Sequence, residues 1–195
     1  MRKIVHAVLF CFILSGCVLG SANPFFTPDL VVEMPELYGN WFYEKDIKSD
    51  NKAPVVISSG KITIFDDKGI PGEAKLTFFK VEQVLFVDFF PDEGEFKKEL
   101  FEDKSPLHFI CLIKYENGKL LFNPLDYAWL GKEVEAGRIP MPYQKAGTDE
   151  DVDIILTASS AQWIEFLKAH RNDPKAFPED DAWLIRKPVD DKKVP

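Results

Sequence analysis

Short segments in which apolar and polar side chains alternate dominate the chain from residue 37 onward. Alternation with a period of two predicts β-strands that bury one face, and Phe, Val and Ile favour such strands. Asn117-Gly118 separates two apolar runs, which is a strong hairpin signal, and residues 66–69 form another turn sequence. The expected strands cover residues 37–46, 54–58, 61–65, 74–81, 83–90, 107–115, 119–124, 152–158 and 182–187. Together they predict a mainly β fold, either an antiparallel barrel or a strongly curved sheet.

One later segment, residues 159–170, shows the 3.6-residue period of a helix. Ser159 and Gln162 have the spacing of a capping box, which favours a helix start at this point. Its large side chains fall on a single face and predict a helix packed on the side of the sheet. The residues of this face are Trp163, Phe166, Leu167 and His170.

Residues 126–137 predict a second, shorter helix. Asp126 is the expected N-cap, and Gly137 is the expected stop because glycine readily adopts the left-handed conformation that ends a helix. The predicted elements are thus strand-rich, with one clear helix towards the carboxyl end and one short helix before it.

Residues 1–16 have the features of a bacterial export leader. Two basic residues, at 2 and 3, precede an apolar run at 4–14, which is shorter than the roughly 20 residues that span a bilayer as a helix. The order Leu14-Ser15-Gly16-Cys17 resembles the lipobox of bacterial lipoproteins. In that family a peptidase cuts before the cysteine, whose sulfur carries a diacylglycerol. The alternatives are an ordinary leader or a thiol in a short core helix.

The lipobox implies a location for the mature protein. Lipidation of Cys17 would anchor the protein in a membrane and leave its domain in water, because two acyl chains give a stable anchor. Val18, where Asp would direct sorting to the inner membrane, implies by the same resemblance the outer membrane, facing the periplasm, in a diderm bacterium. We expect a tether at 17–36, one domain at 37–188 and a charged tail at 189–195. Some apolar residues of the tether are able to dock on the domain: Phe25, Phe26, Val31 and Val32.

The charge of the chain bears on its binding partners, and its cysteines bear on whether it contains a disulfide. The formal net charge is −8, from 24 Lys and Arg against 32 Asp and Glu, and no basic stripe interleaves with aromatic residues. This pattern argues against nucleic acid as a partner. Cys11 leaves with the leader and Cys17 is the expected lipid site, so Cys111 remains alone, without a partner for an internal disulfide. Its apolar neighbours predict a buried, unreactive thiol.

The sequence offers few residues for chemistry. His108 and His170 remain after the leader, and the chain has no nucleophile elbow, no zinc spacing and no phosphate-binding glycine loop. We therefore predict no cofactor, no metal site and no catalytic residue. Asp88 lies between Phe86 and Phe90 on one strand face. The simpler expectation is an exposed carboxylate near the strand end; the other is a buried one, which must be paired or protonated.

Several dispersed residues resemble the lipocalin family, whose small antiparallel barrels close over one apolar ligand. Gly39 and Trp41 match its Gly-x-Trp motif, and Leu125-Asp126-Tyr127 resembles its second motif, with Leu125 in place of the usual Thr. A late strand that carries Arg186, after a helix, matches the lipocalin ending. The resemblance implies that an arginine packs over Trp41, with Arg186 in that role and Arg171 as the other candidate. It implies an architecture more than a ligand.

The main functional expectation is a membrane-anchored lipoprotein whose barrel domain binds a small apolar ligand, such as a lipid, at the cell envelope. A cavity above about 300 Å³ would favour this function, whereas a solid barrel interior would favour the interaction protein described next. The ligand itself is unknown, and Asp88, His108 and Trp129 are the candidate contacts. The alternative is an interaction protein with a filled barrel that docks another envelope protein through Tyr127, Trp129 and Tyr143. A third hypothesis, an enzyme, requires Asp88, His108 and Asp126 to meet in one cleft.

Overall fold

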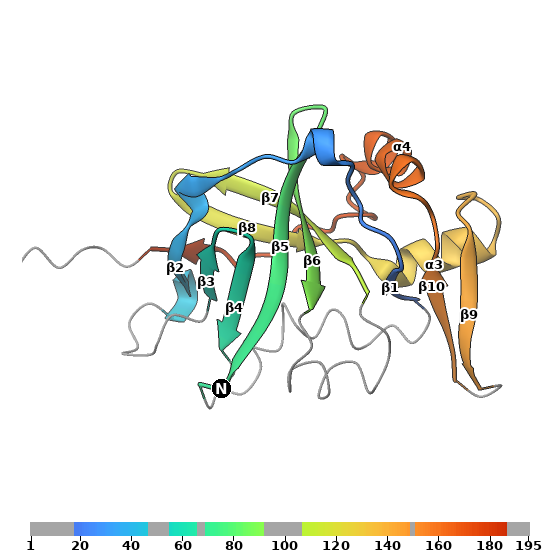
Figure 1. Cartoon of the computed structure of the whole chain (residues 1–195), viewed down its shortest axis with the longest axis horizontal. Coiled ribbons are helices and arrows are strands. Elements are labelled where there is room, and N and C mark those ends of the chain that lie inside the picture. The colour runs from blue at the N-terminus through green and yellow to red at the C-terminus, as the bar shows by residue number, and fades with distance from the viewer. Residues whose placement is uncertain (1–17, 47–54, 66–68, 92–106, 149–150, 187–195) are drawn as a thin grey trace, which may run out of the picture.

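In the described part of the chain, eight strands close into an antiparallel barrel (Figure 1). The structure is a computed structural model that describes residues 18–46, 55–65, 69–91, 107–148 and 151–186. The barrel strands are β2 (Gly39–Tyr43), β3 (Val55–Ser58), β4 (Lys61–Phe65), β5 (Pro71–Val81), β6 (Val84–Pro91), β7 (Phe109–Glu116), β8 (Lys119–Pro124) and β11 (Leu184–Ile185). Each strand pairs with the next one along the chain, and β11 closes the ring between β8 and β2.

The inner face of the barrel is filled with apolar side chains, which we call the barrel cluster. Every barrel strand contributes to it at alternating positions, as expected for strands that bury one face. Trp41 is fully buried at one end, and Cys111 is buried among the others, as predicted. The cluster consists of Leu37, Trp41, Tyr43, Val55, Ile57, Ile62, Leu76, Phe78, Val87, Cys111, Ile113, Leu120, Phe122 and Leu184.

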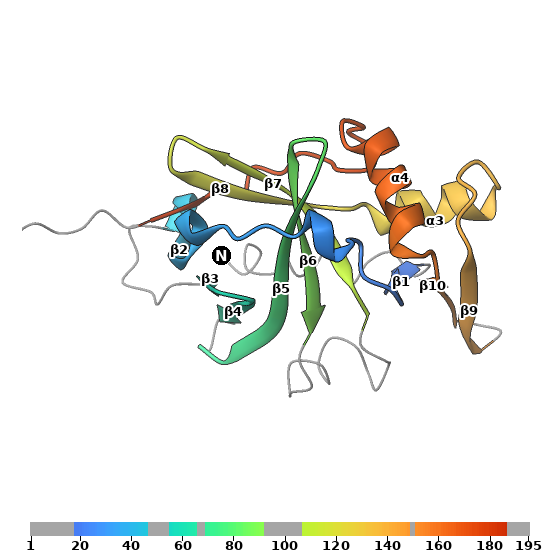
Figure 2. The same cartoon turned by 45° about the horizontal axis from the view of Figure 1, so that its top comes forward.

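The outer face of β5, β6 and β7 carries a second core, the flank cluster. It joins side chains of these strands, such as Phe79, Phe86 and Ile110, to side chains of the helices and of the amino-terminal segment. Figure 2 shows both helices on the side of the barrel where β1 lies. The Phe-rich strands are therefore buried on two faces, which is why their sequences read as nearly continuous apolar runs.

Two helices cover the flank cluster. They are α3 (Tyr127–Glu135) and α4 (Ser160–His170). Asp126 caps α3, Gly137 follows with a left-handed φ of 69°, and Ser159 and Gln162 form the capping box of α4, all as predicted. The predicted fold class is confirmed: a mainly β, lipocalin-like antiparallel barrel with a carboxyl-terminal helix packed on it. Within the described residues, the structure contains no helix with the length and apolar character needed to cross a membrane.

A small separate sheet lies beside the barrel. It consists of β1 (Val18–Ser21), β10 (Asp151–Leu156) and β9 (Tyr143–Thr148), with β1 parallel and β9 antiparallel to β10. The expected strand at 152–158 thus belongs to this sheet and not to the barrel. No strand was predicted over β9, whose sequence lacks apolar alternation.

Residues 18–36, predicted as a tether, pack against the rest of the protein. Val18 already lies in β1, and the fully buried Phe25 ring lies 4.4 Å from the Trp163 ring, measured between centroids. The reason is that the flank cluster needs an apolar cover that the helices alone do not supply. Cys17 and the predicted tail at 189–195 lie outside the described residues.

Candidate ligand-binding cleft

The end of the barrel where β2 begins is closed by side chains. The Trp41 indole N–H donates a hydrogen bond of 2.8 Å to the Leu37 carbonyl. The guanidinium carbon of Arg186 lies 4.8 Å from the centre of the Trp41 ring, and the same guanidinium donates to the Tyr38 carbonyl at 3.0 Å. Arg171 lies elsewhere, in an ion pair with Glu82. This is the packing that the lipocalin resemblance implied for Arg186. Gly39 opens β2 with φ of 129°.

Asp88 and His108 meet in the flank cluster. Asp88 is buried, with 2% exposure, so the expectation of an exposed carboxylate was wrong. Its Oδ1 lies 2.8 Å from Nδ1 of His108, and its Oδ2 accepts a hydrogen bond of 3.1 Å from the Phe25 N–H. The carboxylate is therefore paired, as burial requires. The pair joins β6 and the residue before β7 to the amino-terminal segment, which explains it as a structural contact.

The three residues of the enzyme hypothesis do not share the cleft described below. Asp126 accepts a hydrogen bond of 2.9 Å from the Trp129 N–H and so caps α3. Asp88 and His108 are bound to each other on the barrel side of the flank cluster. None of the three lines this cleft.

The aromatic residues of the expected docking surface also separate. Tyr127 is buried, and its hydroxyl accepts a hydrogen bond of 3.1 Å from the Ile110 N–H. Burial raises the pKa of Tyr127 well above its usual range. Trp129 is half-buried with its ring centre 5.7 Å from that of His170, while Tyr143 is exposed on β9. The three do not form one exposed patch, because Tyr127 points into the core.

A cleft opens where β6 and β7 diverge. These strands pair from Phe86 opposite Leu112 to Phe89 opposite Phe109, but β6 begins two residues earlier, at Val84, and β7 continues to Glu116. The space between the diverging ends has a volume of about 630 Å³ and is completed by the chain that follows α4. Side chains of β5, β6, β7 and β8 therefore meet there with residues distant in sequence.

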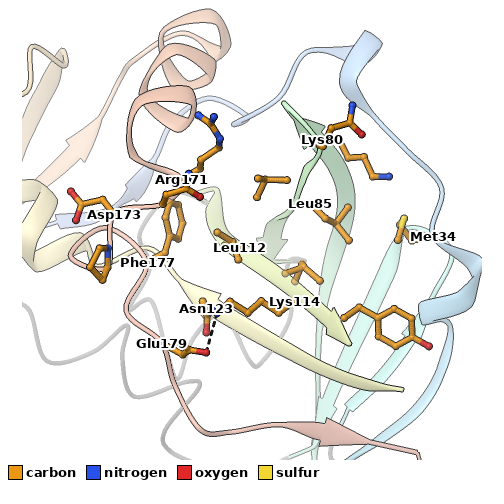
Figure 3. A pocket seen from close by; sticks show the side chains of 16 residues that line it. Met34, Lys80, Leu85, Leu112, Lys114, Asn123, Arg171, Asp173, Phe177 and Glu179 are labelled. Atoms are coloured by element: carbon orange, nitrogen blue, oxygen red, sulfur yellow. Dashed lines mark hydrogen bonds and ion pairs between the residues drawn. The ribbon is translucent and has the colours of Figure 1, made fainter. Parts of the chain in front are cut away.

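Apolar side chains form much of the wall of this cleft (Figure 3). Leu85 and Ile113 lie at the boundary with the barrel cluster, whereas Leu112 and Phe177 belong to the flank cluster. The cleft thus lies between the two cores. Its apolar lining consists of Met34, Val84, Leu85, Leu112, Ile113, Tyr115, Pro174 and Phe177.

Polar side chains complete the lining. Asn123 on β8 is 1% exposed, and its Oδ1 lies 3.5 Å from the Asp180 backbone nitrogen, which donates to it. Charged and amide groups come from β5, β7, the β5–β6 turn and the chain after α4: Lys80, Gln83, Lys114, Arg171, Asn172, Asp173 and Glu179. Eight of the lining residues are apolar and eight are polar, so the cleft offers both kinds of contact to a bound molecule. In the chain as described, no group of three or more His, Cys, Asp or Glu is placed to hold a metal ion.

The sequence did not predict the position of this cleft. Asp88, His108 and Trp129, the predicted ligand contacts, all lie outside its lining. The one local signal was Lys80, a charged residue in an apolar strand next to the turn at Glu82 and Gln83. Comparisons with protein-family models, with curated proteins and with solved structures found no match for this chain.

Proposed function

We propose that this protein is a membrane-anchored lipoprotein whose β-barrel domain binds a small apolar ligand at the cell envelope. The observation that carries the proposal is the cleft of about 630 Å³ between β6 and β7. Its volume falls within the range of about 300 to 1,000 Å³ that is usual for small-molecule sites. In this proposal the cleft is the ligand site.

The interior of the barrel is filled, which is the condition stated above for the interaction protein, so the proposal of a ligand depends on the cleft and not on the barrel interior. Trp41, Ile57 and Ile62 occupy the interior with at most 2% exposure. A ligand in this place would have to displace well-packed side chains, which costs the free energy of their burial. A ligand that enters the cleft between β6 and β7 contacts the barrel cluster only at its edge, near Ile113, and displaces no other buried side chain of that cluster.

The anchor in this proposal is a lipid on Cys17. Val18 follows directly and lies in β1, so no free linker would separate the lipid from the domain. The small sheet would then be held at the membrane surface. A Cys17→Ser protein should lose its lipid adduct and its retention in the membrane fraction. Unchanged retention would contradict the anchor without bearing on the cleft.

The ligand is tested with native mass spectrometry on the full Cys17→Ser chain, exported and purified without detergent. We expect a reproducible small-molecule adduct that organic solvent releases. The variant Val84→Trp, which fills the cleft, should lose this adduct, whereas Lys75→Trp, on an exposed part of β5 outside the cleft, should keep it.

A clean mass for the unmodified chain would contradict the binding function if it persisted after incubation with fatty acids and phospholipids. That result would favour the alternative, a module that docks another envelope protein.

A further inference from the structure

The charged groups of the cleft differ in whether they already have partners. The Lys114 ammonium lies 2.9 Å from a carboxylate oxygen of Glu179, and the Arg171 guanidinium lies 2.6 Å from one of Glu82. Lys80 is exposed near the end of β5, on the strand face that carries Leu76 and Phe78, and it forms no ion pair with any residue that the structure describes. Among the described cations of the lining, Lys80 is thus the one without an ion pair to a described carboxylate.

The acidic groups of the lining are engaged as well. Glu179 is held by Lys114, and Asp173 accepts a hydrogen bond of 2.9 Å from the Lys175 N–H and lies 3.6 Å from Nδ1 of His170. The Glu179 carboxylate is thus paired with a cation, and both acidic groups lie at the side of the cleft formed by the chain after α4. The opposite side, formed by Lys80 and the apolar residues below it, therefore presents a positive charge to a ligand.

The position of Lys80 relative to the apolar wall is plain in Figure 3. Its side chain lies on the side of Met34 and Leu85, and Leu112 lies between Leu85 and Phe177. Lys80 is exposed and marks the rim of the cleft, whereas Leu112 is buried. A ligand chain that covers the apolar wall would bring its end group to this rim. A molecule that matches both the apolar wall and the Lys80 ammonium group has one apolar chain and one compact negative headgroup.

We infer that the cleft selects amphiphiles with a single anionic headgroup, and that Lys80 is the residue that determines this specificity. The inference rests on the proposed function, because it names the class of ligand for the same cleft. Carboxylate and phosphate headgroups share the required chemistry, since each accepts charge-assisted hydrogen bonds from an ammonium group. The net charge of the whole protein is −8 and would repel an anionic ligand. A preference for an anionic headgroup would therefore have to come from the local positive charge of Lys80.

Three ligands with the same ten-carbon chain test the inference: decanoate, decyl phosphate and the neutral decanol. Their dissociation constants are measured by isothermal titration calorimetry with the full Cys17→Ser chain. We expect an anionic ligand to bind about tenfold more tightly than decanol, since a hydrogen bond to a charged group contributes at about this level. Comparison of decanoate with decyl phosphate identifies the preferred headgroup.

Substitution of Lys80 isolates its contribution. Lys80→Met keeps the apolar stem and should reduce the anionic preference to less than about twofold, with binding of decanol unchanged. Lys75→Met, the matched control on the same strand but outside the cleft, should retain the preference. Raising the ionic strength to about 1 M should weaken the preference in the unsubstituted chain, because the Debye length falls to about 3 Å.

The outcomes distinguish the headgroup selection by Lys80 from the binding of an apolar ligand in the cleft. Equal binding of decanol and both anions, or a preference that survives Lys80→Met, would overturn the inference and leave the proposed function in place. Failure of all three ligands to bind would contradict the proposed function itself.

Discussion

The barrel interior and the cleft beside it are built from the same strands but have opposite properties. Inside, side chains from every strand meet and leave Trp41 and Leu120 with no exposed surface. At the cleft, β6 and β7 no longer pair beyond Phe86 and Leu112. The separation of the two strands leaves a volume of about 630 Å³. The comparison teaches that closure of a small barrel does not decide where open volume remains. Volume arises where the hydrogen-bonded pairing of neighbouring strands ends.

The largest expected effect comes from emptying the interior. Trp41→Ala removes a fully buried ring and should lower the free energy of unfolding by about 3 to 5 kcal/mol. The measurement is equilibrium denaturation with urea. A change below about 1 kcal/mol would mean that the interior is not the tightly packed core described above.

A smaller loss of stability is expected from the buried polar contact of the flank cluster. Asp88→Val removes the acceptor of the Phe25 N–H and the partner of His108, so we expect a loss of about 2 kcal/mol in the free energy of unfolding. The matched control is Asp181→Val, which breaks the exposed pair with Lys45 and should leave stability close to that of the unsubstituted chain. Equal effects of the two substitutions would contradict a structural role for Asp88.

The closed end should show a weaker dependence on Arg186. Arg186→Leu removes the cation above the Trp41 ring and should cost about 1 kcal/mol by denaturation. It should leave binding in the cleft unchanged, because Arg186 does not line it. The Trp41 ring contacts that of Tyr115, which lines the cleft, with ring centres 6.3 Å apart. A loss of ligand binding in this variant would therefore show that the packing of Arg186 on Trp41 influences the cleft.

The smallest expected effect on stability is that of filling the cleft. Val84→Trp should change the free energy of unfolding by less than about 1 kcal/mol, because Val84 is only partly buried, yet it should abolish ligand binding. A strongly destabilised Val84→Trp protein would indicate that the cleft is part of the core. This contrast with Trp41→Ala sharpens the distinction between packed and open regions.

Local signals in the sequence were sufficient for many elements. The Asn117-Gly118 hairpin forms, with left-handed φ of 52° and 75°, because these two residue types tolerate that conformation. Both helix caps also formed as predicted, since Asp126 and Ser159 accept hydrogen bonds within their own first turns. Signals of this kind act between near neighbours and so can be read without the fold.

Long-range pairing was beyond the sequence. Asp88 is buried because residues from the amino-terminal segment, including Phe25, cover it. The sequence of its own strand does not indicate that another segment packs over it. The cleft likewise depends on the register at which β6 and β7 part and on the position of Phe177, which is far from both in sequence. The strand at 143–148 was missed for the related reason that β10 stabilises it, although its own residues do not alternate.

The most direct test of the central claim is methyl NMR of the Cys17→Ser chain titrated with decanoate. Binding in the cleft should shift the methyl signals of Val84, Leu85 and Leu112, which line it, and leave those of Val55, Ile57 and Ile62 in the barrel interior unchanged. Shifts centred on Val55, Ile57 and Ile62 would place the ligand inside the barrel and contradict the account. Unchanged signals at both sets of methyl groups would contradict ligand binding altogether.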